Sequence, residues 1–457
     1  MQIRGSTLGI IDICVFYTAL AVSLLIRYGD EQFNAQWSIH WQPFTAVLVC
    51  WLVSLYIANL YEHRTLQNGR VFAERLGQAV IMASLLAISF FYLVAVVAIT
   101  PRANLFLFMI IVTALTVLVR ATINTILFRS GKQRVIMVGL NDASLDLAEF
   151  LHENPQFGYS VNGIVQLGQE SLGVATRTIR WPVLTKLSDL AQLVDQKLVD
   201  LIVISPAVYS HDEIIDLLFE ALPKKIDFIK LSSLAEQLTG RVPLDAIDQA
   251  WFLENIAEGS KKSYETLKRG FDIFGAILLG IPVAIISPFV VAAIWITSPG
   301  YPFIHQRRTG LHGKPFALIK FRTMIPDAEA KTGVVWAQEN DPRVTRFGRF
   351  LRKTRIDELP QIWNILRGDM SIVGPRAERP EFDSQLKMHV PFYPERYLIK
   401  PGLSGWAQIN PPYYYASIQD AIRKVEYDLY YIAHRSFGLD VEIILKTISI
   451  ALRRAGR

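Results

Sequence analysis

The chain has little charge and almost no cysteine for its length. Only 19% of its 457 residues are charged, and its two cysteines, Cys14 and Cys50, both lie within apolar runs. A disordered chain would need more charge and fewer apolar residues, and a small disulfide scaffold would need many more cysteines. The absence of a CxxC motif or a Cys/His spacing argues against a structural zinc site. The sequence also lacks a Walker loop, an HExxH motif and a GxSxG elbow, which removes the commonest nucleotide-hydrolase, metalloprotease and esterase patterns.

Apolar residues make up 51% of the chain and are concentrated in its first third. Four apolar runs there each approach the roughly 20 residues that a helix needs to cross a bilayer. Basic residues gather in the loop after the second run and after the fourth, which places the N-terminus and everything after residue 128 in the cytoplasm. We expect Arg120 to reach the headgroups from the cytoplasmic end of its run. Residues 1–128 are thus predicted to be a four-helix transmembrane domain that serves as an anchor or an oligomer contact. The four runs are Leu8–Ile26, Pro43–Leu60, Ala79–Ile99 and Leu105–Leu127.

From residue 129 to residue 250 the apolar periodicity is that of an α/β domain. Short β-branched runs alternate with amphipathic segments, which predicts a Rossmann-like domain with a small parallel sheet. Its first turn, VIMVGLNDASLDLAEFL, has only Gly139 where a dinucleotide site needs GxGxxG, so we expect regulation or dimerisation rather than dinucleotide binding. The expected strands are Arg134–Gly139, Val161–Val165, Val199–Ile204 and Ile226–Leu231, and the expected helices are Ala143–Glu153, Leu187–Gln196 and Asp212–Leu222.

A fifth apolar run, Phe271–Ile296, follows a linker at residues 251–267. Pro282 and Pro288 interrupt it, and a proline in a helix removes a backbone hydrogen bond and bends the helix. Both flanks are basic, so a full crossing would place one basic cluster outside the cell. A re-entrant helix over residues 271–298 that breaks at Ser287-Pro288 satisfies both observations. The alternative is a proline-kinked fifth span, which would place the C-terminal domain outside.

The remaining sequence is rich in arginine and in carboxylates. Six basic residues without an acid lie within Arg343–Arg355, four of them spaced by three, which predicts a helix with a basic stripe. Such a stripe suits lipid headgroups and equally the wall of a diphosphate site. Asp357 and Glu358 follow directly. Adjacent carboxylates can divide the work of a nucleophile and a metal ligand, although capping of a helix dipole is the simpler role for such a pair.

Two other functions are compatible with parts of the sequence. A Tyr-x-x-x-Lys pair, Tyr264 and Lys268, suggests a membrane-anchored nucleotide-sugar epimerase or dehydratase, but it lies outside the α/β domain and the glycine fingerprint is missing. A non-catalytic scaffold for polysaccharide assembly is the second alternative. A nucleic-acid partner is not expected, because no nucleic-acid-binding motif accompanies the basic residues.

From about Lys268 onward the chain resembles the bacterial polyprenyl-phosphate sugar-1-phosphate transferases, the monotopic phosphoglycosyl transferases. The resemblance rests on the Ser287-Pro288 break, GKPFALIKFRTM, DPRVTRFGRFLRKTRIDELPQIWNILRGDMSIVGPR and KPGLSGWAQIN. The preceding helices and Rossmann-like domain look like the large subclass. GVVWAQ (333–338) with PRAERPEF (375–382) looks like members from exopolysaccharide clusters. The implied fold is a four-helix membrane bundle, a Rossmann-like α/β domain, and a mostly α monotopic catalytic domain at residues 268–457 with a re-entrant membrane helix.

The resemblance also implies a reaction at the bacterial inner membrane, on its cytoplasmic side. A UDP-sugar and undecaprenyl phosphate would give undecaprenyl-diphosphate-sugar and UMP, with Mg²⁺, in the first membrane step of exopolysaccharide or other surface-glycan assembly. In that family the aspartate that matches Asp357 attacks the β-phosphate to form a covalent phosphosugar intermediate, and the glutamate that matches Glu358 is associated with the metal. We expect a homodimer. The basic positions that the resemblance places near the phosphates are Lys320, Arg322, Arg352 and Arg376.

Departures from the family pattern are few. Thr323 stands where serine is commoner, and Ala377 replaces a proline after the Arg376 turn. Asn410 is followed by two prolines where many members carry Gly-Arg, and this loop bears on sugar choice. The sequence therefore assigns a reaction class and leaves the sugar open.

Overall fold

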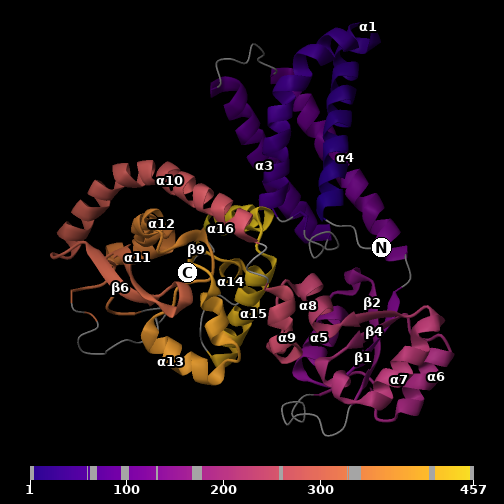
Figure 1. The fold of residues 1–457 in the computed structure, drawn as a ribbon. Coiled ribbons are helices and arrows are strands. Elements are labelled where there is room, and N and C mark those ends of the chain that lie inside the picture. The colour runs from indigo at the N-terminus through magenta and orange to yellow at the C-terminus, as the bar shows by residue number, and fades with distance from the viewer. Residues whose placement is uncertain are drawn as a thin grey trace. The chain divides into compact units, whose positions relative to one another are not determined.

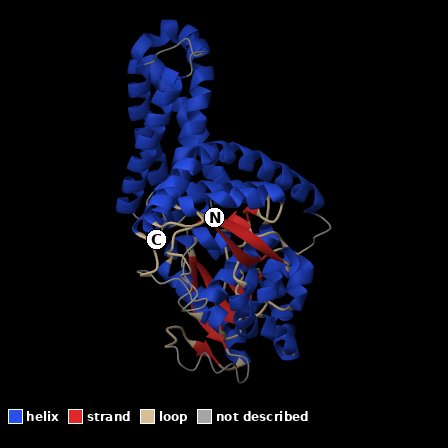
Figure 2. Cartoon of the chain, turned by 90° about the vertical axis from the view of Figure 1, so that its left-hand side faces the viewer, coloured by secondary structure: helices blue, strands red, loops and turns tan. Residues whose placement is uncertain are grey.

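The structure is a computed structural model with two compact units, residues 1–203 with 208–228, and residues 204–207 with 229–457. Helices dominate both, and the strands of the described residues form one five-stranded sheet and two short sheets (Figure 2). The expected motif at 333–338, the two prolines after Asn410, and Arg64 in the basic loop after the second apolar run lie outside the described residues. The structure describes residues 5–58, 60–61, 69–93, 102–129, 132–166, 178–256, 261–326, 328, 341–410 and 417–452.

The N-terminal bundle consists of α1 (Gly5–Ile57), α3 (Gly69–Leu93) and α4 (Arg102–Arg129) (Figure 1). The first two predicted runs belong to α1, which has a non-helical residue, Gly29, with φ 71°. Glycine tolerates this backbone conformation, and it divides α1 into two arms. The arms touch, since the Tyr17 hydroxyl lies 2.9 Å from Oγ1 of Thr45. All three helices are long and apolar enough to cross a membrane.

Arg120 is not at the bundle surface, so the expectation that it reaches the headgroups is wrong. Its side chain is 2% exposed, and Nη2 lies 2.6 Å from Oδ2 of Asp12, which is 1% exposed. Its guanidinium also lies over the ring of Tyr61, 5.4 Å from the ring centroid. A charge inside an apolar bundle is costly unless a neighbouring helix supplies the opposite charge, and α1 supplies it here.

The α/β domain confirms the predicted alternation of strands and helices. Its sheet has the order β3-β2-β1-β4-β5, and β1 pairs in parallel with β2 and β2 with β3. Asn141 caps α5 by accepting a hydrogen bond from the Ser144 backbone. A two-residue strand, β3, was not predicted. The strands are β1 (Gln133–Val138), β2 (Tyr159–Val165), β3 (Val183–Leu184), β4 (Leu201–Ile204) and β5 (Asp227–Lys230), and the helices are α5 (Asp142–Glu153), α6 (Leu187–Asp195) and α7 (Asp212–Ala221).

Residues 231–256 pack in the second unit, so the boundary expected at residue 250 lies earlier in the chain. They form α8 (Leu231–Thr239) and α9 (Gln249–Asn255). Trp251 donates from Nε1 to the buried Glu236 carboxylate at 3.0 Å. Trp406 donates from Nε1 to Gly240 O at 2.6 Å, with its ring against this left-handed glycine. Val242 and Trp251 belong to the same apolar core as the C-terminal helices.

The second unit contains a two-stranded hairpin, a short pair of parallel strands and several helices. In the hairpin β6 and β7 are antiparallel, with Lys320 opposite Ile304. The strands are β6 (Phe303–Thr309), β7 (Pro315–Phe321), β8 (Ser371–Val373) and β9 (Gly402–Ser404). The helices are α10 (Lys262–Thr297), α11 (Arg346–Thr354), α12 (Ile362–Arg367), α13 (Pro380–His389), α14 (Trp406–Ile409), α15 (Ile418–His434) and α16 (Phe437–Leu452).

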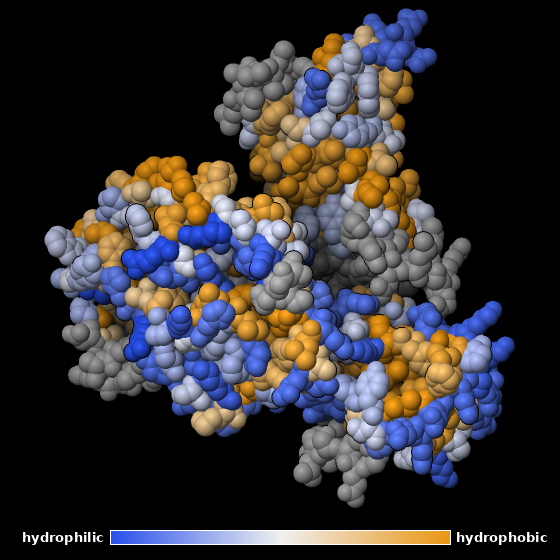
Figure 3. Space-filling model, viewed as in Figure 1, coloured by the Kyte–Doolittle hydropathy of each residue, from blue (hydrophilic) through white to orange (hydrophobic). Residues whose placement is uncertain are grey.

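Helix α10 continues through Pro282 and Pro288, so the expected break of the helix at Ser287-Pro288 is wrong, and α10 instead follows a curved path (Figure 1). Its first half is tied to the second unit, because Arg269 donates to Ile365 O at 2.7 Å and Asp272 accepts from Ile372 N at 2.9 Å. Its second half packs Val290 and Ile294 against β7 and α11. The remaining faces are apolar and uncovered (Figure 3). Phe274, Ile277, Leu278, Ile281, Ile285, Phe289, Trp295 and Ile296 are all more than half exposed.

Candidate functional site

Asp357 and Glu358 lie in a 3₁₀ turn, Ile356–Gln361, between α11 and α12. Thr345 caps α11 by accepting a hydrogen bond from Gly348 N at 2.9 Å. A Cβ at Gly348 would come within 2.0 Å of Thr323 O, so only glycine lets α11 approach the end of β7 this closely. Arg355 then ends α11 in the left-handed conformation, with φ 59°, and redirects the chain. Both carboxylates are thereby placed under β7 at 8% exposure.

Glu358 is held by cations from three separate segments. Its Oε1 lies 3.1 Å from Nζ of Lys320 on β7 and 2.8 Å from Nη2 of Arg376, while its Oε2 lies 3.9 Å from Nη1 of Arg355. Burial opposes ionisation of Glu358, but Arg376, Lys320 and Arg355 outweigh it and hold the pKa of Glu358 well below its usual value. Glu358 is therefore an anion fixed within a cationic cradle.

Asp357 has a different environment from its neighbour. Among the described residues nothing donates a hydrogen bond to its Oδ1, although this atom is buried. Burial and the adjacent charge of Glu358 raise the pKa of Asp357, and Lys320, Arg352 and Arg355 oppose this rise. The two carboxylates are thus pushed apart in pKa, with one fixed by cations and the other left with an unpaired oxygen. Such a division is a mark of functional sites.

The structure brings Asp357, Glu358, Lys320 and Arg376 together, and it places Arg352 beside them. Nε of Arg352 donates to Oγ1 of Thr323 at 2.9 Å, so the commoner serine and this threonine offer the same acceptor. Arg322 is not part of this group. Its guanidinium hydrogen-bonds Ser298 O at the end of α10.

Ser287 and Pro288 have a structural position within α10. The Ser287 hydroxyl donates to Val283 O at 2.6 Å, a bond that occurs within the helix. The basic residues of the stripe divide into two groups in the structure. Arg352 and Arg355 face the carboxylates, whereas Arg346, Arg349 and Lys353 are exposed on α11.

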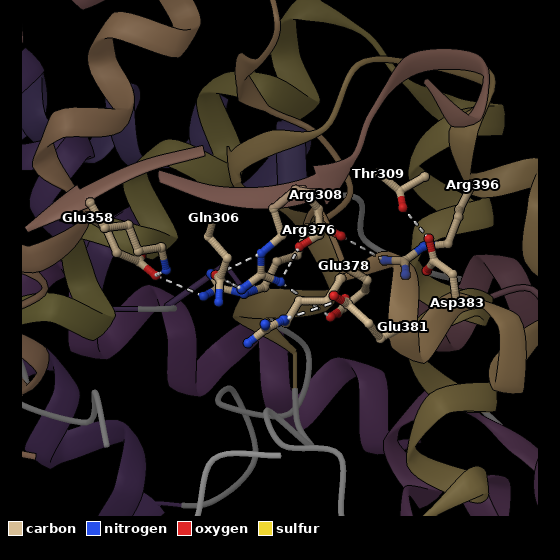
Figure 4. Close-up of polar contacts among 12 residues, drawn as sticks. Gln306, Arg308, Thr309, Glu358, Arg376, Glu378, Glu381, Asp383 and Arg396 are labelled. Carbon is tan, nitrogen blue, oxygen red and sulfur yellow. Dashed lines mark hydrogen bonds and ion pairs between the residues drawn. The ribbon is translucent and has the colours of Figure 1, made fainter. Parts of the chain in front are cut away.

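Sequence reasoning missed Arg308 on β6 as a site residue. Its Nη1 donates to Ala377 O at 2.9 Å and lies 3.9 Å from Oε2 of Glu378. Burial lowers the pKa of Arg308 to about 10, with Glu378 opposing and the cations Arg376 and Arg379 adding to the fall. Figure 4 shows Arg308 beside Arg376, between Glu358 and Glu378. The available signal was its position in the QRRTG block, next to the GKPF motif that begins β7.

The carboxylate pair fits Mg²⁺. Within the part of the chain that the structure describes, no three His, Cys, Asp or Glu side chains gather into a metal cluster. Mg²⁺ needs only one or two carboxylates when substrate phosphates supply the other ligands. Glu358 can provide this minimal set through Oε2, which lies 3.9 Å from Nη1 of Arg355, whereas Oε1 is held by Lys320 and Arg376. The buried Oδ1 of Asp357 then stays available for another role.

The alternative pair, Tyr264 and Lys268, is engaged elsewhere. Both donate to Oδ2 of Asp440, at 2.8 and 2.9 Å, and Lys268 is 8% exposed. Their position on α10, tied to α16, is not that of a catalytic pair in an open nucleotide cleft. The epimerase interpretation therefore has no site in the described residues.

Comparison with known proteins matches two family models, a bacterial sugar transferase over residues 263–454 and a CoA-binding domain over residues 56–229. A UDP-N-acetylgalactosamine-undecaprenyl-phosphate N-acetylgalactosaminephosphotransferase of Aeromonas hydrophila is 41% identical over 50% of this chain and 52% of its own length. A UDP-glucose:undecaprenyl-phosphate glucose-1-phosphate transferase of Xanthomonas campestris pv. campestris is 32% identical over 69% of this chain and 66% of its own length. An uncharacterized sugar transferase of Bacillus subtilis is 39% identical over 42% of this chain and 89% of its own length. The chain thus spans less than two thirds of the first two relatives.

Proposed function

The chain belongs to the bacterial sugar transferase family, and we propose that it transfers a sugar 1-phosphate from a UDP-sugar to undecaprenyl phosphate. The observation that carries the proposal is the buried Asp357-Glu358 pair within a ring of cations, with Oδ1 of Asp357 unpaired among the described residues. Phosphoryl transfer needs little covalent machinery beyond positioning and cations around the transferring group. The relatives' names, which specify a UDP-sugar and undecaprenyl phosphate, supply the substrate classes.

In the proposed first step a carboxylate oxygen of Asp357 attacks the β-phosphorus of the UDP-sugar. The bond from that phosphorus to the bridging oxygen breaks, and UMP leaves with the bridging oxygen and the electron pair. In the second step an oxygen of the lipid phosphate attacks the same phosphorus, and the Asp357 carboxylate is released. A carboxylate nucleophile at phosphorus is chemically ordinary, and the acyl phosphate divides one displacement into two.

The cations around the pair have distinct proposed roles. Lys320 and Arg376 keep Glu358 ionised and, with Arg352, stabilise the charge that spreads over the phosphoryl oxygens. Glu358 would hold Mg²⁺. When bound, this ion would neutralise charge on the diphosphate. Arg322, tied to α10, supports the end of β7 instead of the phosphates.

We also propose that α10 is a re-entrant membrane element of a protein of the bacterial inner membrane. Both halves of α10 contact the same catalytic unit, through Asp272 and Val290 among others, which leaves its apolar faces for lipid. A helix attached to one domain along its length does not pass through the bilayer away from that domain. The catalytic and Rossmann-like domains are then cytoplasmic, where UDP-sugars are available. We further propose an exopolysaccharide or related pathway and a homodimer.

One assay tests the reaction and identifies the sugar. Full-length protein in liposomes with undecaprenyl phosphate and Mg²⁺ should release UMP from one member of a UDP-sugar panel. Asp357→Asn should lower this release by about 10³-fold or more, because the amide keeps the shape but is not a nucleophile. Asp369→Asn is the matched control, since Asp369 accepts a hydrogen bond from Asn364 at 3.3 Å in the same unit. Near-normal turnover by Asp357→Asn would refute the covalent role.

A labelling experiment tests the topology. Lys314 is exposed at the turn between β6 and β7, so Lys314→Cys, in a chain whose Cys14 and Cys50 are serines, reports the side of the catalytic unit. We expect a membrane-impermeant maleimide to label it from the cytoplasmic face only. Labelling only from the outside would overturn the re-entrant arrangement in favour of a fifth span.

A further inference from the structure

The turn that carries Arg376 is held at four successive backbone carbonyls. Pro375 O accepts from Gly402 N at 2.9 Å, and Glu378 O accepts from Thr309 N at 2.9 Å. Between them, Arg376 O accepts from Nη2 of Arg396 at 3.1 Å. The remaining carbonyl, of Ala377, accepts from Nη1 of Arg308 at 2.9 Å. Turns are ordinarily mobile. Hydrogen bonds to each carbonyl of this turn fix its backbone and thereby the orientation of the Arg376 side chain.

Arg396, which holds the Arg376 carbonyl, is almost fully buried. Its side chain is 2% exposed, and its Nη2, besides holding Arg376 O, lies 2.7 Å from Oδ2 of Asp428, which is also 2% exposed. Its Nη1 donates to the Tyr393 hydroxyl at 3.0 Å, which in turn donates to Oδ1 of Asp383 at 2.9 Å. Figure 4 shows Arg396 and Asp383 on the side of Arg376 opposite Glu358.

We propose that Arg396 is a positioning residue for Arg376, and this rests on the transfer reaction proposed above. By holding the Arg376 carbonyl from behind, Arg396 directs the Arg376 guanidinium at Glu358 and at the diphosphate bound beside it. Asp428 and Tyr393 fix the Arg396 fork in turn. A simple buried ion pair between Arg396 and Asp428 would need only opposite charges. The positioning role needs the planar fork, whose Nη2 contacts both Arg376 O and Asp428 while Nη1 holds the Tyr393 hydroxyl.

Arg396→Lys separates these two roles, because it keeps the charge opposite Asp428 and loses the fork. UMP release is measured with full-length protein for wild type, Arg396→Lys, Arg376→Ala and the double variant. Arg435→Lys is the matched control. Arg435 is 4% exposed, and its guanidinium holds Ile432 O at 2.7 Å and Glu265 at 3.0 Å, away from the Arg376 turn.

We expect Arg396→Lys to lower kcat by about 10²-fold, the cost of a misaimed site group, while its melting temperature matches that of Arg435→Lys. In the Arg376→Ala background the same change should have no further effect, since a positioning residue acts only through its target. Tyr393→Phe, which removes one hydroxyl, should show the same dependence on Arg376 with a smaller loss. It also provides the test if Arg396→Lys does not fold.

Two results would overturn the proposal. One is an equal loss of kcat with and without Arg376, which indicates a general structural role. The other is a kcat for Arg396→Lys equal to that of Arg435→Lys. Failure of the transfer reaction itself is distinguishable, because wild type would then release no UMP from any UDP-sugar, and the role of Arg396 would fall with it.

Discussion

Replacing Lys320 by methionine should impair catalysis far more than folding. Nζ of Lys320 lies 3.1 Å from Oε1 of Glu358, and the two side chains are 18% and 11% exposed. At an effective dielectric constant of about 20 their gross attraction is about 5 kcal/mol. Two effects reduce the net contribution to stability. Burial already lowers the pKa of Lys320, and Arg376 remains 2.8 Å from the same oxygen after Lys320 is lost.

The expected change in the free energy of unfolding is therefore about 2 kcal/mol, the usual scale for one hydrogen bond to a charged group. Stabilisation of the transition state depends more strongly on Lys320, because negative charge develops there on the phosphoryl oxygens and a preorganised cation is needed to stabilise it. Loss of one preorganised donor of this kind typically costs about 10²- to 10³-fold in kcat. We thus expect Lys320→Met to fold, with a modestly lower melting temperature, and to release UMP at least about 100-fold more slowly.

The assay is UMP release under saturating UDP-sugar, together with thermal unfolding of the same preparations. Lys314→Met is the control, because Lys314 lies on the same hairpin and is exposed. It should match wild type in both measurements. A kcat for Lys320→Met within about threefold of wild type would refute the cationic role assigned to the Glu358 cradle, whatever its effect on stability.

Two further predictions concern buried charges outside the site. Asp12→Asn leaves Arg120 buried without its counterion and should lower the free energy of unfolding of the bundle by about 3–5 kcal/mol. The double variant Asp12→Asn with Arg120→Met should recover much of that stability in thermal unfolding. An unchanged melting temperature for Asp12→Asn alone would contradict the ion pair. Burial raises the pKa of Glu236 to about 7 against the hydrogen bond from Trp251, so the folded state keeps a proton that the unfolded state loses. Stability from this proton should be lost as the pH rises from about 4.5 to 7, by no more than about 3 kcal/mol. The melting temperature of Glu236→Gln should therefore rise relative to that of wild type as the pH increases from 5 to 8. A constant difference in melting temperature between the two proteins over this range would disprove the prediction.

Periodicity located the α/β domain well because its central strands are short continuous buried runs and its helices bury one regular face. The predicted strand Arg134–Gly139 and helix Ala143–Glu153 each lie within one residue of the observed bounds. The two arms of α1 are harder to predict from the sequence, since a single residue, Gly29, decides whether two apolar runs are separate helices or one bent helix. Arg120 was misplaced for a related reason. Its partner Asp12 lies on another helix, and no local pattern reveals a pairing across a bundle.

At the site, local motifs identified the reacting pair but not every supporting side chain. Lys320 and Arg322 are two residues apart, which suggests one face of a strand, yet β7 ends at Phe321 and Arg322 turns away to Ser298. Arg308 and Arg396 come from segments far from Arg376 in sequence, and their role depends on the carbonyls that they reach. Such backbone contacts have no signature in a single sequence.

The most direct test of the account is a single-turnover measurement without the lipid acceptor. If Asp357 forms a covalent phosphosugar, wild type mixed with the correct UDP-sugar and Mg²⁺ should release a burst of about one UMP per active site, because the first displacement does not need undecaprenyl phosphate. The peptide that contains Asp357 should gain the mass of the sugar phosphate, and Asp357→Asn should show neither burst nor adduct. UMP release that appears only after undecaprenyl phosphate is added, with an unmodified Asp357 peptide, would contradict the covalent mechanism.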